Sequence, residues 1–107
     1  MSNNNSLRNF KEFNSYPFLN KGGKSIIDVM GSCSKSGQVL LQYIIKTGIC
    51  KQEQSVIDID DFLKESGYKT KASGIKALIE LCREEVIART KFPYLYWIRK
   101  DIFDKNI

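Results

Sequence analysis

Residues 67–82 read "GYKTKASGIKALIELC", and their apolar side chains recur with the spacing of a helix that buries one stripe. That stripe comprises Ala72, Ile75, Leu78, Ile79 and Cys82. The opposite face is basic and nearly free of bulky groups, with Lys69, Lys71, Ser73, Gly74 and Lys76. Exposed helices usually begin with Asp or Glu, because carboxylates complement the positive N-terminal end of the helix dipole. The lysines at this helix start therefore need an explanation.

Upstream of this helix, the sequence predicts another helix and a short strand. Candidate caps at Ser34 and Ser36 precede the apolar run "VLLQYII", and Gly48 ends the segment, which is typical of a helix. Residues 55–59, "SVIDI", alternate in polarity and are too few for a helix, so they predict a brief strand. Residues 25–30, "SIIDVM", fit either a short helix or a strand.

A second, short helix is expected to begin at Asp60 or Asp61 and to end at Gly67, where a tight link leads into the long helix. Beyond the long helix, residues 86–90 and 95–99 are rich in strand-forming side chains. They flank "KFPY", in which proline favours a turn. This pattern predicts a β-hairpin.

The order of these elements indicates a known architecture. A short helix joined by a tight turn to a longer one is the helix-turn-helix unit, and a trailing hairpin makes it a winged helix. We predict an α+β, mainly α fold, with a three-helix core, a short strand and a C-terminal β-hairpin wing, over residues 25–107. Residues 1–24 are expected to form a polar, partly disordered N-terminal arm. Its aromatic residues indicate that part of it packs on the domain or on a partner chain, and they are Phe10, Phe13, Tyr16 and Phe18.

The basic charge of the chain is local. The 107 residues carry a net charge of +5, and this length indicates a single domain. Within residues 69–100, Lys and Arg outnumber Asp and Glu by 8 to 3, an excess equal to the net charge of the whole chain. The predicted long helix and hairpin therefore carry the basic surface.

The composition argues against an enzyme or a metal site. The chain has no histidine, no glycine-rich phosphate loop and no nucleophile elbow. The acidic group Asp58, Asp60 and Asp61 could hold a divalent cation, but acids at a strand-to-helix junction more often cap the helix. The three cysteines form no C-x-x-C pair. We therefore expect no catalysis, no cofactor and no metal.

The N-terminus "MSNNNSLRNF" lacks the apolar region of a signal peptide, and the chain has no run of about 18 apolar residues. The cysteines are expected to be reduced thiols. We therefore expect a cytoplasmic protein without membrane association.

A helix-turn-helix explains the basic face. The long helix is expected to point its first half into the DNA major groove, with Gly74 and Ala77 allowing close approach, while Glu80 and Glu84 lie beyond the duplex. The side chains expected to contact DNA are Lys69, Thr70, Lys71, Ser73 and Lys76 on the helix and Arg89, Lys91 and Tyr94 on the wing, with support from Arg99 and Lys100. Lysines at a helix start can also serve solubility alone. Their coincidence with a short preceding helix and a basic hairpin favours DNA.

Residues 73–103, "SGIKALIELCREEVIARTKFPYLYWIRKDIF", resemble the winged-helix domain of RepL-type plasmid replication initiators. The matching pieces begin at Ile75, Val86, Tyr96 and Ile102, and "LLQYII" is similar to the family's first winged-helix element. Two features depart from the family: "CREEV" stands where a Lys-Gly usually ends the helix, and Arg99 replaces the usual Asn. The resemblance implies sequence-specific duplex binding at an origin and recruitment of host replication proteins, without nicking.

We therefore expect a sequence-specific double-stranded DNA-binding protein, and specifically a plasmid or phage-type replication initiator that binds origin DNA as a homodimer. A small winged-helix transcriptional regulator would show the same sequence features. A winged helix that serves as a protein-interaction module is an alternative from a different class.

Overall fold

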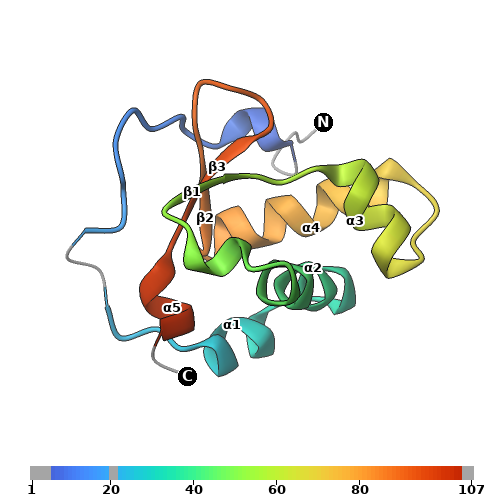
Figure 1. Cartoon of the computed structure of the whole chain (residues 1–107), viewed down its shortest axis with the longest axis horizontal. Helices are drawn as coiled ribbons and strands as arrows, with labels where there is room; N and C mark the ends of the chain where they lie inside the picture. Colours follow the sequence, from blue (N-terminus) through green and yellow to red (C-terminus); the bar gives the residue numbers. More distant parts are fainter. Residues whose placement is uncertain (1–5, 20–21, 105–107) are drawn as a thin grey trace.

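The computed structural model describes residues 6–19 and 22–104, and it is mainly helical with one three-stranded antiparallel sheet (Figure 1). The α-helices are α1 (Ile26–Ser32), α2 (Lys35–Lys46), α3 (Ile59–Ser66), α4 (Lys71–Arg83) and α5 (Lys100–Asp104). The remaining elements are the strands β1 (Gln54–Val56), β2 (Ile87–Arg89) and β3 (Leu95–Ile98) and the 3-10 helices η1 (Leu7–Asn9) and η2 (Ile49–Lys51). The predicted α+β, mainly α class is confirmed. None of the described helices combines the length and apolar character needed to cross a bilayer.

Side-chain caps explain where two of these helices begin. Ser25 and Asp28 form a reciprocal capping box, with hydrogen bonds of 3.2 and 3.1 Å, and this makes α1 a helix rather than a strand. Asp58 caps α3 by accepting the backbone N–H groups of Asp60 and Asp61. The predicted cap at Asp60 or Asp61 is therefore wrong. Both residues instead lie in the first turn, where their charge complements the helix dipole.

Helices α2, α3 and α4 pack around an apolar core. Phe62 of α3 is fully buried and meets the Tyr43 ring of α2 edge-on, with ring centroids 5.4 Å apart. The Tyr43 hydroxyl donates a hydrogen bond of 2.5 Å to the Asp61 carboxylate, so its polar end also has a partner. The predicted three-helix core is present.

The sheet has the strand order β1-β3-β2, with β3 in the middle. Ser55 of β1 lies opposite Tyr96, and Ala88 of β2 lies opposite Trp97. Because side chains alternate along a strand, the buried Tyr96 and Ile98 share one face of β3, while the half-buried Trp97 lies on the other. The sheet thus has one face in the core and one face left for another segment to cover.

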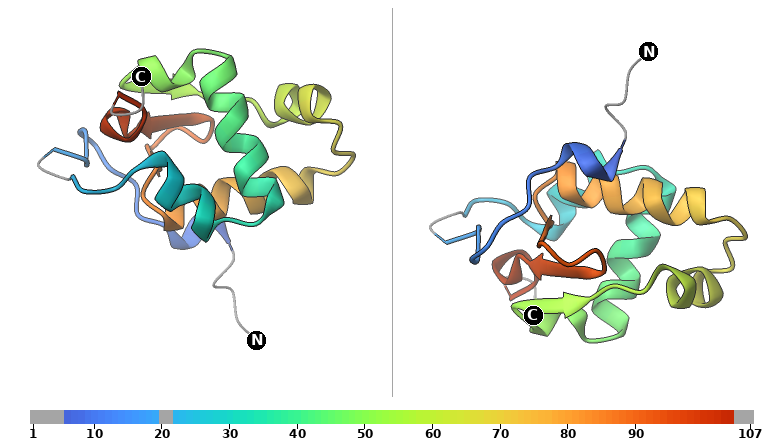
Figure 2. Two further views of the ribbon diagram at one scale, coloured as in Figure 1. Left: turned by 90° about the horizontal axis from the view of Figure 1, so that it is seen from below. Right: turned by 90° about the horizontal axis from the view of Figure 1, so that it is seen from above.

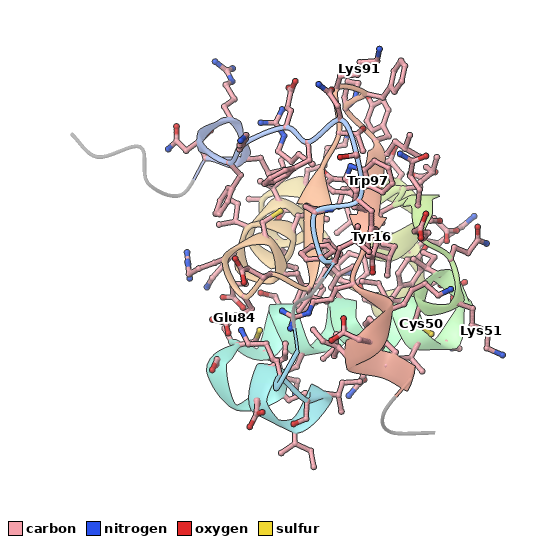
Figure 3. All side chains as sticks on the ribbon, turned by 90° about the vertical axis from the view of Figure 1, so that its left-hand side faces the viewer. Tyr16, Cys50, Lys51, Glu84, Lys91 and Trp97 are labelled. Atoms are coloured by element: carbon pink, nitrogen blue, oxygen red, sulfur yellow. The ribbon has the colours of Figure 1, made fainter. Side chains whose placement is uncertain are left out.

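The N-terminal segment covers that second face. Its Phe13 amide donates to the Arg89 carbonyl at 2.9 Å, and Glu12 forms a parallel bridge with Arg89, so the segment lines the edge of β2. The Trp97 indole N–H donates to the Phe13 carbonyl at 3.0 Å. The Tyr16 ring lies edge-on to Trp97, with centroids 6.0 Å apart (Figure 3). Residues far apart in the sequence are therefore held together here by polar and aromatic contacts.

The first turn of this segment also reaches the helical layer. Helix η1 contacts α4 (Figure 2). On α4, Ile79 lies one turn after Ile75 and is only 5% exposed. The predicted arm thus packs on the domain over residues 6–19. The prediction of a partly disordered arm also covers residues 1–5 and 20–21, and these lie outside the described residues.

Glu80 of α4 caps the start of α2. Its Oε1 accepts the Ser34 backbone N–H at 2.9 Å, and the residue is only 8% exposed. The carboxylate also lies at the positive end of the α2 dipole. Gly37 leaves room for it, because a Cβ at this position would collide with the Glu80 carboxylate. Glu80, which was expected with Glu84 farther along the DNA-facing side of the helix, is instead buried against the start of α2.

Replacing Glu80 by Ala is expected to lower the free energy of unfolding by about 1 to 3 kcal/mol, because the part-buried Ser34 N–H at the α2 start loses a charged acceptor. Gly37→Ala should also destabilise the fold, although Ala favours helices, because it displaces the same carboxylate. Urea denaturation followed by circular dichroism measures both changes. The matched control is Glu65→Ala, whose loose surface pair with Lys46 contributes little. Equal losses in Glu80→Ala and the control would contradict the cap.

Candidate nucleic-acid interface

The exposed face of α4 differs from the predicted face by a rotation about the helix axis. Gly74 and Ala77, expected to approach DNA, are buried, whereas Ala72 and Ile75, expected in the core, are exposed. At Gly74 a Cβ would come within 3.0 Å of the Ile59 side chain of α3. The missing side chain therefore serves the close crossing of α3 and α4. The expectation for these four α4 residues was wrong for that reason.

At the start of α4, the hydroxyls of Thr70 and Ser73 contact each other, and the lysines are exposed to solvent. Thr70 Oγ1 accepts the Ser73 N–H at 3.4 Å and therefore caps the helix, and the two hydroxyl oxygens lie 3.3 Å apart. The cationic side chains near this end are all exposed, and they are Lys69, Lys71 and Lys76. Lys71 Nζ lies 3.8 Å from Asp60 Oδ1, but both side chains are mostly in water, so this pair is weak.

A groove of about 520 Å³ lies between α4, the start of α3 and the hairpin tip. Lys71 and Ile75 line it from α4, and Tyr94 lines it from the hairpin. Asp58 and Asp60 give the groove an acidic lip on the α3 side. The start of α4 and the hairpin tip therefore border one surface, above which the β2–β3 loop rises in Figure 1.

Lys91 and Tyr94 lie in the exposed turn of the hairpin. Lys91 Nζ is 5.5 Å from the centroid of the neighbouring Phe92 ring, and Figure 3 shows Lys91 at the outer end of the hairpin. Tyr94 is 69% exposed. Both side chains are thus available to a macromolecule that approaches the α4 start.

Arg89 does not belong to this exposed surface. Its guanidinium donates to the carbonyls of Leu7 and Phe10 at 3.1 and 2.9 Å, and it pairs with Glu12 at 3.0 Å. Arg89 was predicted to contact DNA, and the structure corrects this assignment. Sequence reasoning missed the partners because they lie in the N-terminal arm, 77 to 82 positions away in the chain.

Arg99 is likewise withdrawn from solvent. It is 2% exposed, pairs with Asp101 at 3.2 Å, and lies 6.0 Å from the Phe18 ring centroid. The Lys100 amide donates to the Tyr16 hydroxyl at 3.2 Å. The expected support of the wing by Arg99 was therefore wrong, because this guanidinium holds the arm.

The structure brings Lys71 and Tyr94 to one groove and leaves three further lysines exposed: Lys69 in the α3–α4 link, Lys76 on α4 and Lys91 in the hairpin turn. No family model, curated protein or solved structure matches the chain. The cations at this surface are lysines on flexible stems, which suit contacts to phosphate oxygens more than a fixed bidentate geometry.

The described thiols and acids do not form a reactive cluster. Cys33, Cys50 and Cys82 are free and buried, and no group of three or more described Cys, Asp or Glu residues is placed to hold a metal ion. Burial raises the pKa of Cys82 to about 12 and, together with the Glu80 charge, the pKa of Cys33 to about 11. Both thiols are protonated near neutral pH and are therefore poor nucleophiles.

Arg89→Ala is expected to lower the free energy of unfolding by about 1 to 3 kcal/mol, because two carbonyls and one carboxylate of the arm lose a charged donor. Lys91→Ala, two residues along the chain, should change it by less than about 0.5 kcal/mol, since this side chain is exposed. Thermal denaturation of both variants measures the difference. Unchanged stability of Arg89→Ala would contradict the clamp on the arm.

Stability is expected to fall as the pH rises from about 10 to about 12. Burial raises the pKa of Tyr96 from 10.0 to about 12, so within this window the unfolded chain releases a proton that the folded chain keeps. Tyr96→Phe removes this contribution and should show a shallower alkaline loss in urea titrations followed by Trp97 fluorescence. At pH 8 the hydroxyl is neutral in both states, which provides the reference. An identical alkaline slope in the two proteins would contradict the assignment.

Proposed function

We propose that this chain is a winged helix-turn-helix protein that binds double-stranded DNA through the start of α4 and the tip of the β2–β3 hairpin. The element order α2-β1-α3-α4-β2-β3 and the sheet order β1-β3-β2 support the architecture. The observation that carries the proposal is the set of exposed cations around these two elements, Lys69, Lys71, Lys76 and Lys91.

In this proposal the first two turns of α4 enter the major groove, and the lysines replace counterions on the phosphates. The α4 N-terminus, beside Thr70, faces a phosphate through its free amides. Ile75, which is 40% exposed, offers an apolar contact to a thymine methyl group. About four phosphate contacts correspond to a slope of roughly −4 in log affinity against log salt.

The family resemblance favours a plasmid or phage-type replication initiator that recruits host proteins and has no catalytic step of its own. Two copies on two half-sites, acting in the cytoplasm, complete the proposal. A transcriptional regulator would use the same surface.

A protein-interaction module is a second candidate, and the groove favours it. Val56, Ile75 and Tyr94 are 55, 40 and 69% exposed, and Asp58 and Asp60 line the same groove. An apolar floor with an acidic lip suits a basic, amphipathic peptide. The carboxylates of that lip would repel a phosphate backbone, so the two candidates make opposite predictions for Asp60.

Lys71→Ala and Lys76→Ala are each expected to weaken duplex binding and to reduce the salt slope by about 1, because each removes one phosphate contact. Fluorescence anisotropy of a labelled duplex measures the affinity across a salt series. Lys51→Ala is the matched control, because Figure 3 shows Lys51 far from the hairpin tip marked by Lys91. Melting temperatures should not change, since these side chains are exposed. Equal weakening by Lys51→Ala would indicate non-specific charge attraction and contradict the proposed surface.

Asp60→Asn separates the two candidate functions. If α4 binds DNA, loss of this negative charge should strengthen duplex binding, because Asp60 partly neutralises Lys71. If the groove binds a basic peptide, the same change should weaken the interaction. Anisotropy titrations of the variant against the duplex provide the measurement, and weaker DNA binding would contradict the proposal.

A further inference from the structure

The hairpin tip carries two large aromatic side chains that the fold leaves in solvent. Phe92 and Tyr94 are 56% and 69% exposed, and they flank the exposed Pro93. The aromatic residues of β3 itself, Tyr96 and Trp97, are buried or covered by the N-terminal segment. The exposed rings therefore form a local apolar projection, which we call the aromatic tip and define as residues 92–94.

Hydrogen bonds hold the aromatic tip in one shape. The buried Thr90 hydroxyl accepts the Phe92 N–H at 3.0 Å, and its single proton has two acceptors within reach, the Leu95 carbonyl at 2.9 Å and the Phe92 carbonyl at 3.1 Å. The Ile57 amide donates to the Tyr94 carbonyl at 3.0 Å, which fastens the turn to the segment after β1. A rigid turn presents its side chains at a low cost in conformational entropy. This bracing is typical of a contact element rather than of a free loop.

The surroundings of the aromatic tip favour a polyanion as its partner. Lys91 Nζ lies 5.5 Å from the Phe92 ring, and Lys71 shares the groove wall with Tyr94. An apolar projection flanked by cations matches a nucleic acid, in which base faces lie between two phosphate backbones. Asp58 and Asp60, which line the same groove, are the nearby opposing charges, and Lys71 lies beside Asp60.

We propose that the aromatic tip inserts into the DNA minor groove and partly unstacks one base step. This inference rests on the proposed function, since α4 must occupy the adjacent major groove. Apolar wedges of this kind bend the duplex toward the major groove, which would wrap the DNA onto α4. Flexible TA steps would be deformed most easily, so the tip would add a preference for sequences that it does not read through hydrogen bonds.

The test uses the full chain and an alternating A·T duplex of about 30 base pairs, with 2-aminopurine replacing central adenines, at about 50 mM salt. Anisotropy reports binding, and 2-aminopurine fluorescence reports unstacking. At saturating protein the fluorescence is expected to rise by about twofold or more, because unstacked 2-aminopurine is no longer quenched by its neighbours. The double variant Phe92→Ala/Tyr94→Ala should still bind but should lose the rise.

Two control variants keep the result interpretable. Tyr94→Phe retains both rings and should keep the fluorescence rise, whereas Lys91→Ala should weaken binding but keep the rise at saturation. Thermal denaturation checks that all variants are folded. Binding without any fluorescence rise, or a full rise with the double alanine variant, would overturn the wedge and leave duplex binding intact. A wild-type chain that shows no anisotropy change would overturn both proposals.

Discussion

Two close contacts fix the rotation of α4, and the rest of the surface depends on that rotation. Near its start, Gly74 admits the Ile59 side chain of α3. Farther along, Glu80 reaches across to the start of α2, where Gly37 leaves room for its carboxylate. Because both contacts lie on the inner side of α4, the helix cannot rotate about its axis without losing them. Ala72 and Ile75 therefore face outward with the neighbouring lysines.

Elements with local signals could be predicted from the sequence, and contacts between distant segments could not. Thr70 and Gly67 mark helix ends through their own backbone chemistry, so the α3–α4 turn was readable. The face of α4 was misjudged because its apolar residues lie on both sides of the helix, and only the Gly74 contact chooses between them. Arg89 was misassigned because a cation on a strand looks the same whether its partner is a phosphate or a remote carbonyl.

Two arginines and the lysines of the proposed surface differ in their surroundings. Arg89 and Arg99, whose planar groups donate several hydrogen bonds in fixed directions, hold the N-terminal segment against the sheet. The lysines near the α4 start and the hairpin tip are exposed to solvent. A surface of this kind attracts a polyanion over a distance but leaves discrimination to shape and to apolar contacts. Ile75 and the aromatic tip are the groups that supply such contacts.

The placement of Glu12 and Phe13 along β2 has a practical consequence. An unpaired strand edge can template pairing with another chain, and this segment occupies part of that edge. A shortened polypeptide that starts after residue 19 would expose both the strand and the Trp97 side of the sheet. Such a fragment would tend toward open-ended self-assembly and precipitation, so expression trials should retain the first residues even though their composition resembles a dispensable tail.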